Sequence, residues 1–354
     1  MAKHTQTRVK KTKRKKRKRR VLIVLLPILT VLFAVGYWFL QLWTTAESVI
    51  TESYEDDGRE KSELRTEVVD PKEDNVSILI MGVDESDHRG NKGQSRTDAL
   101  ILATLNINDK SVKLLSIPRD SLVYIPERGH EDKINHAHYF GGPKSTVETV
   151  ENLLNIPVDY WVRLNFEAFV QVVDALNGIE VDVPYEFRES NSQDKRDSIH
   201  LLPGKQTLNG EEALALARTR KHDNDIERGK RQMEIIKAVI DKALSIGSVL
   251  KYDDLIRAVG DNLTTNMTFS EMTSFISYGS KGLNLDVESY TLEGSNYMPG
   301  NIYYWKLDEE ALLETQTIFR RHLEIDSVET PVSNQNLNDH EQATSVEDEV
   351  TSTF

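Results

Sequence analysis

The chain has 354 residues, 38% of them hydrophobic, which is enough to bury one large core or two small ones. It contains no cysteine, which excludes disulfides, thiolate metal sites and a cysteine nucleophile. The net charge of −13 is uneven, because residues 1–20 carry twelve Lys and Arg and no acid, while the other 334 residues carry 32 basic and 57 acidic side chains.

The N-terminal region has the pattern of a membrane anchor. Residues 21–43 form an uncharged run of 23 residues, and about 20 apolar residues suffice for a helix to cross the hydrocarbon core. Tyr37, Trp38 and Trp43 lie where an aromatic belt would meet the far interface, and the preceding Lys and Arg place the N-terminus in the cytoplasm. A cleaved signal peptide is the alternative, but the apolar run is long for one.

We therefore expect a single-pass type II protein with a cytoplasmic polybasic tail at 1–20, a transmembrane signal anchor at 21–43 and the remainder outside the cell. Residues 44–74 predict a juxtamembrane stalk, because this region is rich in acids and has little apolar periodicity. Residues 324–354 contain eight acids and no Lys or Arg, which predicts an acidic disordered tail. The globular domain is expected at 75–323.

Hydrophobic patterns predict alternating strands and helices in that domain. An apolar run at 76–83 is typical of a buried strand, and the runs at 99–107 and 112–117 predict a hairpin. Further strands are expected at 158–164, 179–183 and 287–292, and helices at 143–154, 166–176, 225–246, 249–259, 270–280 and 308–322. This alternation predicts an α/β fold with a mixed central β-sheet flanked by helices, preceded by one transmembrane helix.

Four arginines are concentrated at 213–232, namely Arg218, Arg220, Arg228 and Arg231. Guanidinium groups match phosphate oxygens in paired hydrogen bonds, and a helix N-terminus attracts anions. A helix entered at Asn209 and a second from Asp225 would bring these arginines together, with Gln232 on the same face as Arg228. If the chain between the helices is extended, Arg218 and Arg220 point the same way.

The spacing predicts an anion clamp for phosphate or pyrophosphate, but it fits solvated arginines paired with neighbouring acids equally well.

Other charged residues fall at predicted strand ends or in the loops beside them, namely Asp84, Arg96, Asp98 and Arg119. Open α/β sheets bind ligands at this position. By position alone, the two aspartates could cap strands or pair with arginines.

Six motifs tie these segments together. They are GVD at 82–84, RTD at 96–98, IPRD at 117–120, KINHAHYFGG at 133–142, LNGEEALALARTR at 208–220 and DIERGKRQ at 225–232. In this order, over about 150 residues, they resemble the LytR-CpsA-Psr family, and the resemblance covers roughly residues 75–250.

The resemblance implies an extracytoplasmic phosphotransferase of a Gram-positive cell membrane. Such an enzyme would take an anionic glycopolymer, here wall teichoic acid, from an undecaprenyl pyrophosphate carrier and join it to a hydroxyl of peptidoglycan.

By the same resemblance, the pyrophosphate would contact Arg96, Arg119, Arg218, Arg220, Arg228 and Gln232. Asp84 and Asp98 would bind Mg²⁺, and Arg119, Asp98 and Asp225 would be catalytic. The general base stays open among Asp98, Asp120 and Asp225.

Three other functions remain as alternatives. A hydrolase would use the same cluster with water as the acceptor, and a carrier-binding module would bind the lipid without turnover. A transcriptional attenuator would bind DNA through the basic tail. However, a tail of twenty residues has no folded reader of base edges, so no specific nucleic-acid binding is expected.

Overall fold

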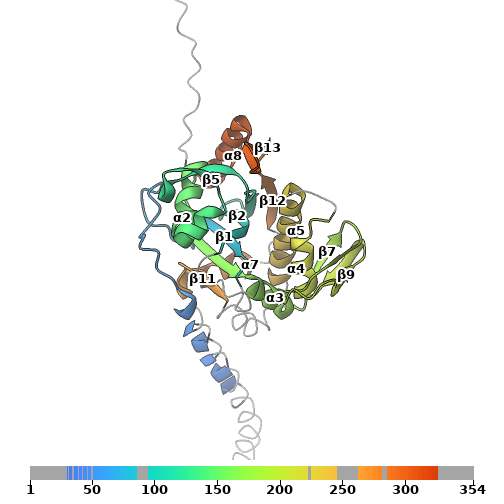
Figure 1. The fold of residues 1–354 in the computed structure, drawn as a ribbon. Coiled ribbons are helices and arrows are strands. Elements are labelled where there is room, and N and C mark those ends of the chain that lie inside the picture. Colours follow the sequence, from blue (N-terminus) through green and yellow to red (C-terminus); the bar gives the residue numbers. More distant parts are fainter. Residues whose placement is uncertain are drawn as a thin grey trace, which may run out of the picture.

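A computed structural model describes residues 51–85, 95–221, 225–244, 262–280 and 285–325, and parts of 30–48. Its centre is a six-stranded sheet in the order β11-β6-β1-β2-β3-β12 (Figure 1). Four strands, β1, β3, β6 and β12, run parallel, and β2 and β11 are antiparallel to them. The strand bounds are β1 Val76–Val83, β2 Thr97–Asn106, β3 Ser111–Ser116, β6 Tyr160–Asn165, β11 Leu263–Thr265 and β12 Asp286–Thr291. The predicted mixed sheet is therefore confirmed.

Helices cover both faces of the sheet, because alternate side chains of each strand point to opposite faces. Leu79 and Met81 of β1 belong to a core completed by α2 (His136–Leu154) and α8 (Glu309–His322). On the other face, Ile101 of β2 packs in a cluster with Met233 of α5 (Asp225–Leu244). The central strand β1, VSILIMGV, is almost continuously apolar because both its faces are buried.

A second apolar core lies beside α5. It is built from α3 (Phe166–Ala175), α4 (Gly210–Arg218) and four short strands, and Ile235 of α5 packs into it. The short strands are β7 Ile179–Val183, β8 Phe187–Glu189, β9 Ile199–Leu201 and β10 Gly204–Leu208. Figure 1 shows α4 and α5 between the central sheet and this part of the protein.

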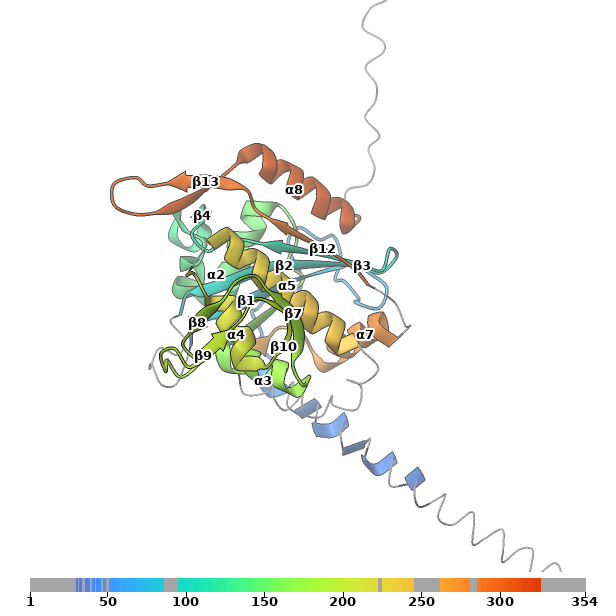
Figure 2. The same ribbon diagram turned by 90° about the vertical axis from the view of Figure 1, so that its right-hand side faces the viewer.

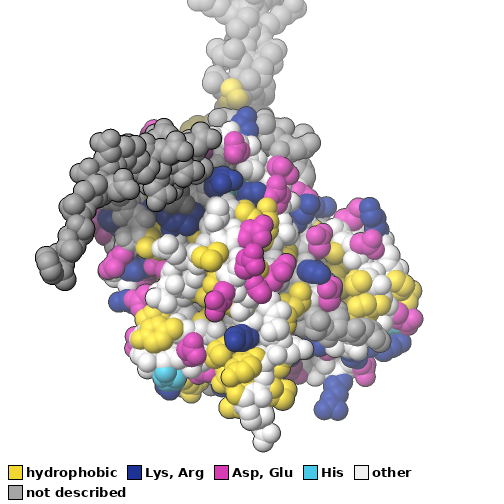
Figure 3. Space-filling view, turned by 90° about the horizontal axis from the view of Figure 1, so that it is seen from above, with side chains coloured by type: hydrophobic (Ala, Val, Ile, Leu, Met, Phe, Trp, Pro, Cys, Tyr) yellow, Lys and Arg dark blue, Asp and Glu magenta, His cyan; other side chains and the backbone are white. Residues whose placement is uncertain are grey.

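Two further hairpins lie outside the sheet. One joins β4 (Leu122–Ile125) to β5 (His130–Lys133) through the short helix η1 (Pro126–Arg128). The other joins β13 (Gly294–Tyr297) to β14 (Tyr304–Leu307) and projects beyond the rest of the domain (Figure 2). Acidic side chains gather on the upper face, where α8 lies (Figure 3). The helix α7 (Phe269–Ser280) packs beside β6.

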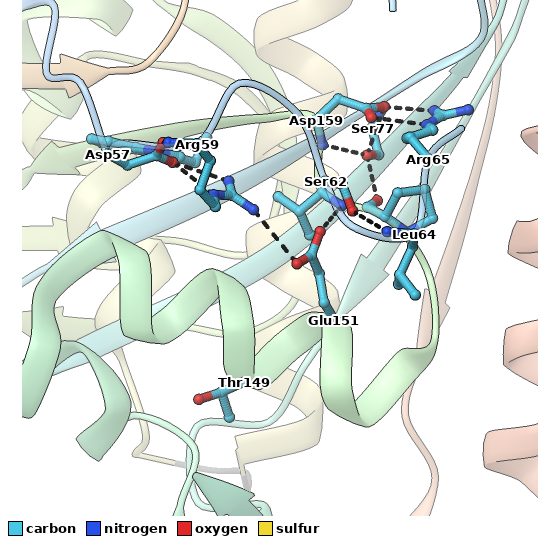
Figure 4. A network of polar contacts seen from close by, with 12 residues as sticks. Asp57, Arg59, Ser62, Leu64, Arg65, Ser77, Thr149, Glu151 and Asp159 are labelled. Carbon is cyan, nitrogen blue, oxygen red and sulfur yellow. Dashed lines mark hydrogen bonds and ion pairs between the residues drawn. The ribbon is translucent and has the colours of Figure 1, made fainter. Parts of the chain in front are cut away.

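Residues 51–74, predicted as a stalk, pack against the domain. The Arg65 guanidinium forms an ion pair with Asp159, with Nη2 2.6 Å from Oδ2, and both side chains are largely buried (Figure 4). The buried indole of Trp161 donates its Nε1–H to Asp57 Oδ2 at 2.9 Å. Arg59 forms ion pairs with two acids: its Nη2 lies 3.0 Å from Asp57 Oδ2, and its Nη1 lies 3.5 Å from Oε2 of Glu151 in α2. This segment, which we call the dock, is therefore an integral part of the fold.

The predicted transmembrane segment 21–43 lies largely outside the described residues. Within the part of the chain that the structure describes, no helix is both long and apolar enough to cross a membrane. The polybasic tail, the expected helix at 249–259 and the acidic tail beyond residue 325 also lie outside the described ranges.

Candidate functional site

The sheet topology gathers the predicted strand-end residues at one edge. Asp84 follows β1, and Arg119 lies in the loop after β3, which runs parallel to β1. β2 begins at this edge, since Val83 pairs with Thr97, so Arg96 and Asp98 lie there too. Arg96 is exposed and lies over the ring of Tyr139, 5.9 Å from its centroid. All four residues lie at strand ends or in the loops beside them, as predicted, and the structure brings them to the same edge.

Asp98 is the extra residue of a β-bulge. Gly82 pairs with Ala99 and Val83 with Thr97, so the register shifts by one residue at Asp98. A bulge re-aims a side chain and is common beside active sites. Here the Asp98 carboxylate accepts a hydrogen bond from Arg119 Nη1, and its side chain is 35% exposed.

Arg119 lies within a row of alternating charges. Its Nε is 3.6 Å from Asp120 Oδ2, and Asp120 Oδ1 accepts a 2.8 Å hydrogen bond from Lys133 Nζ. With Asp98, the row runs acid, base, acid, base from β2 through the loop after β3 to the end of β5. Carboxylates therefore lie on both sides of the Arg119 guanidinium, and the Arg119 side chain is 22% exposed at this edge.

The KINHAHYFGG motif supports the loop that carries Arg119. The backbone N–H of Ile134 donates to Ser121 O at 2.9 Å, and that of Asn135 donates to Arg119 O at 3.2 Å. The helix α2 then begins at His136, earlier than the predicted 143, and kinks at Gly141 and Gly142. Lys133 is the first residue of this motif. Its part in the row of charges was not predicted, because it depends on the contact with Asp120.

The two histidines of this motif make ordinary polar contacts. His138 is buried and donates its Nδ1–H to Ser95 O at 2.8 Å, and burial lowers its pKa. His136 Nδ1 lies 2.8 Å from Asp132 Oδ2. The buried Glu85 accepts a hydrogen bond from Ser95 Oγ at 2.7 Å, which joins the described residues on either side of positions 86–94.

α4 presents Arg218 to the end of β6. The helix begins as predicted, with Asn209 and Glu212 forming a reciprocal capping box. It continues through Arg218, whose guanidinium lies 4.8 Å from the ring centroid of Phe166. Its Nη2 lies 3.9 Å from Asp194 Oδ1, in the charged loop between β8 and β9. Because Arg218 is helical, the expected extended pairing with Arg220 does not form; Arg220 is exposed on the segment that follows.

The first turns of α5 hold the end of α4. Arg231 is buried and donates to Leu216 O at 3.2 Å and to Thr219 O at 2.6 Å, and Gln232 Nε2 donates to Ala217 O at 3.3 Å. These bonds satisfy carbonyls that the helix end leaves unpaired. In this structure Gln232 and Arg231 position the helix terminus that carries Arg218.

Arg228 is brought to the end of β3. Ser116, the last residue of β3, lies against α5 at Gly229, the neighbour of Arg228. A Cβ added at Gly229 would lie 2.6 Å from Ser116 Oγ. Glycine therefore allows α5 to approach the loop of Arg119 closely. Arg228 is 5% exposed. The side chain of Asp225 lies outside the described residues.

Asp84 and Asp98 are the candidate Mg²⁺ ligands. No group of three or more His, Asp or Glu that could hold a metal occurs among the described residues. Two carboxylates on adjacent strands nevertheless fit Mg²⁺, which keeps several waters and takes further oxygens from substrate phosphates.

The chain resembles several known proteins over most of its length. Residues 40–321 match the LytR_cpsA_psr family. The polyisoprenyl-teichoic acid–peptidoglycan teichoic acid transferase TagT of Bacillus subtilis is 42% identical over 259 residues, which cover 73% of this chain and 80% of that protein.

Two solved structures match as well. TagT bound to LIIa-WTA has a TM-score of 0.66 and 40% identity, over 76% of this chain and 98% of that chain. The family protein YwtF (TagT) with bound octaprenyl pyrophosphate lipid has a TM-score of 0.62 and 37% identity over the same shares. Both the sequence match and the shared fold show that this chain belongs to the LytR_cpsA_psr family.

Proposed function

We propose that this protein is a phosphotransferase that moves wall teichoic acid from an undecaprenyl pyrophosphate carrier to a hydroxyl of peptidoglycan. The observation that carries the proposal is the position of Arg119, fixed between Asp98 and Asp120 at the sheet edge that also holds Arg96 and Arg228. A pyrophosphate needs such a cluster of cations. The similarity to TagT supports the same donor and polymer.

In the reaction, the acceptor hydroxyl oxygen replaces the bridging oxygen of the pyrophosphate on one phosphorus atom. The acceptor hydroxyl oxygen attacks the phosphorus that carries the polymer, the bond from this phosphorus to the bridging oxygen breaks, and undecaprenyl phosphate leaves. The product is a phosphodiester between polymer and glycan, and the hydroxyl proton passes to a carboxylate at the edge.

The chain's own residues neutralise and orient the phosphates. Arg119 follows β3, and Gly229, next to Arg228, lies against Ser116 at the end of the same strand. Arg218 lies over the ring of Phe166 after β6, so the three arginines would approach a bound pyrophosphate from two strand ends. Phosphoryl transfer depends mainly on positioning and on stabilising charge at the oxygens. Asp84 and Asp98 would hold Mg²⁺, which supplies further neutralisation of pyrophosphate oxygens when bound.

The proposed location is the outer face of the cell membrane, anchored by residues 21–43 with residues 1–20 in the cytoplasm. The uncharged run and the basic residues before it support this topology.

The test uses the full-length protein in detergent micelles with Mg²⁺, a lipid-pyrophosphate-linked teichoic acid linkage disaccharide and peptidoglycan oligomers. Mass spectrometry should detect the phosphodiester adduct, and both Arg119→Ala and Asp98→Asn should abolish it. Arg321→Ala, at an exposed arginine of α8, is the matched control. Release of the phosphorylated sugar without adduct would contradict the proposal in favour of a hydrolase.

A further inference from the structure

The β13–β14 hairpin exposes apolar side chains that a purely structural hairpin would not need. Tyr297 is 41% exposed, Met298 61% and Ile302 54%. Figure 2 shows the hairpin projecting from the domain as an arm. Contiguous exposed apolar side chains with a polar rim mark a binding surface.

The base of the arm is attached to the catalytic edge, which is the edge of the sheet that holds Asp98 and Arg119. Its base continues from β12, where the backbone N–H of Leu292 donates to Ser116 O at 3.2 Å. On the return strand the N–H of Trp305 donates to Asp120 O at 2.8 Å, next to Arg119. A parallel bridge pairs Trp305 with Ser121. The base of the arm therefore lies next to Arg119 in the proposed phosphate site.

The arm is also preformed. Its two strands pair in register from Gly294 with Leu307 to Tyr297 with Tyr304. Tyr303 Oη donates to Asn296 Oδ1 at 3.0 Å across the strands, and Trp305 Nε1 donates to Leu292 O at 3.3 Å. A fixed surface loses little conformational freedom when it binds a ligand.

Cations accompany the aromatic rings of the arm. Lys133 Nζ lies 6.0 Å from the ring centroid of Tyr303 and 5.7 Å from that of Tyr304. Lys306 Nζ lies 5.9 Å from the ring centroid of Tyr297. Tyrosine combines an apolar ring with a hydroxyl, so this surface suits a ligand with apolar faces, many hydroxyls and carboxylates.

We infer that the arm binds the acceptor as a glycan strand, an amino-sugar oligosaccharide carrying carboxylates, and leads its hydroxyl to the phosphate at Arg119. This inference rests on the proposed function, because the acceptor of that reaction is such a polymer. The lysines would meet the carboxylates, and the tyrosine rings would meet the sugar faces.

A lipid surface fits this arm less well. The arm leads directly into α8, whose exposed first residues are Asp308, Glu309 and Glu310. Bacterial and other anionic lipid headgroups attract basic segments and repel such acids. The acidic side chains on the upper face in Figure 3 lie beside the arm.

The test compares full-length wild-type protein with the double variant Tyr297→Ser, Met298→Ser. Both side chains are exposed, so the fold should be retained, and Leu313→Ser at a 63% exposed position of α8 is the matched control. Titration calorimetry with a purified peptidoglycan tetrasaccharide peptide fragment should show at least about fivefold weaker binding for the double variant. Octaprenyl pyrophosphate, the donor probe, should bind all three proteins equally.

In transfer assays the double variant should raise the KM for acceptor and leave the KM for donor and kcat near wild type. Unchanged acceptor affinity and KM would overturn the inference, as would a loss of binding to phosphatidylglycerol vesicles without a loss of glycan binding. A wild type that binds the fragment through the arm but forms no adduct would overturn the proposed function and leave the arm in place. Normal transfer with an unaffected double variant would overturn the arm alone.

Discussion

Arg119 is held by Asp98, the extra residue of the bulge in β2, so that a backbone irregularity determines where the guanidinium points. A straight strand would turn the carboxylate at this position to another direction, because side chains alternate along a strand. The pairing register of β1 and β2 therefore determines where the carboxylate that holds Arg119 lies.

Arg119→Lys should lower kcat about 100-fold, because an ammonium group keeps the charge but cannot donate in a fork to phosphate and carboxylate together. Steady-state transfer kinetics measure this effect. The thermal midpoint should change little, since the Arg119 side chain is partly exposed. Arg321→Lys should match wild type, and an Arg119→Lys variant of full activity would show that charge alone suffices.

Gly229→Ala should destabilise the protein by about 1–3 kcal/mol, because the new methyl group overpacks against Ser116. The added Cβ would lie 2.6 Å from Ser116 Oγ but 3.5 Å from Ser116 Cβ. Removing the hydroxyl in Gly229→Ala, Ser116→Ala should therefore restore stability. Urea unfolding of both single variants and the double variant measures the coupling, and additive effects would rule out this contact.

Acidification should destabilise the protein through His322. Burial lowers the pKa of His322 to about 4, against 6.5 for an ordinary histidine. The ring lies between Thr104 Oγ1 at 2.8 Å and Ser111 Oγ at 2.9 Å. The unfolded chain binds the proton first as the pH falls below 6.5, so up to about 3 kcal/mol of stability is lost by pH 4.

His322→Gln should flatten the stability profile between pH 6.5 and 4, the interval between the two pKa values. Thermal unfolding at several pH values measures the slope for wild type and variant. Leu313→Ser, at an exposed position of α8 that carries no ionisable group, is the control and should leave the slope unchanged. Equal slopes for wild type and His322→Gln would exclude His322 as the source.

Arg65→Ala should destabilise the dock by about 3 kcal/mol, because it leaves the carboxylate of Asp159 buried without its cation. The Asp159 side chain is 2% exposed. Limited proteolysis should then cut between residues 51 and 74, where wild type is protected. Lys72→Ala, an exposed dock residue, should leave protection intact. Equal cleavage of wild type and Arg65→Ala would show that the ion pair does not hold the dock.

The central strands could be predicted because burial on both faces leaves a direct trace in the sequence. The apolar run 76–83 is β1 in the structure, and Asn209 with Glu212 marked the start of α4 through a local hydrogen-bond pattern. The predicted positions of Asp84, Asp98 and Arg119, at strand ends or in the loops beside them, are those of the structure. These features depend on local sequence or on simple topology.

The remaining features depend on distant partners. β13 and β14 are short and polar, and Trp305 is fixed by the backbone of Asp120 far away in sequence. The roles of Arg231 and Gln232 depend on the backbone carbonyls of α4, which no side-chain motif reveals. The bulge at Asp98 is a property of the pairing between two strands, so neither strand alone predicts it.

The dock has a consequence for how far the enzyme can reach. With residues 21–43 in the membrane as proposed, the chain has few residues left as a free tether before Trp161 and Asp159 bind Asp57 and Arg65. The catalytic edge then stays at a nearly constant height above the bilayer, and the domain rotates together with the membrane helix. Wall material far from the membrane would be out of range, so such an enzyme would act on glycan strands while they are still close to the site of their synthesis.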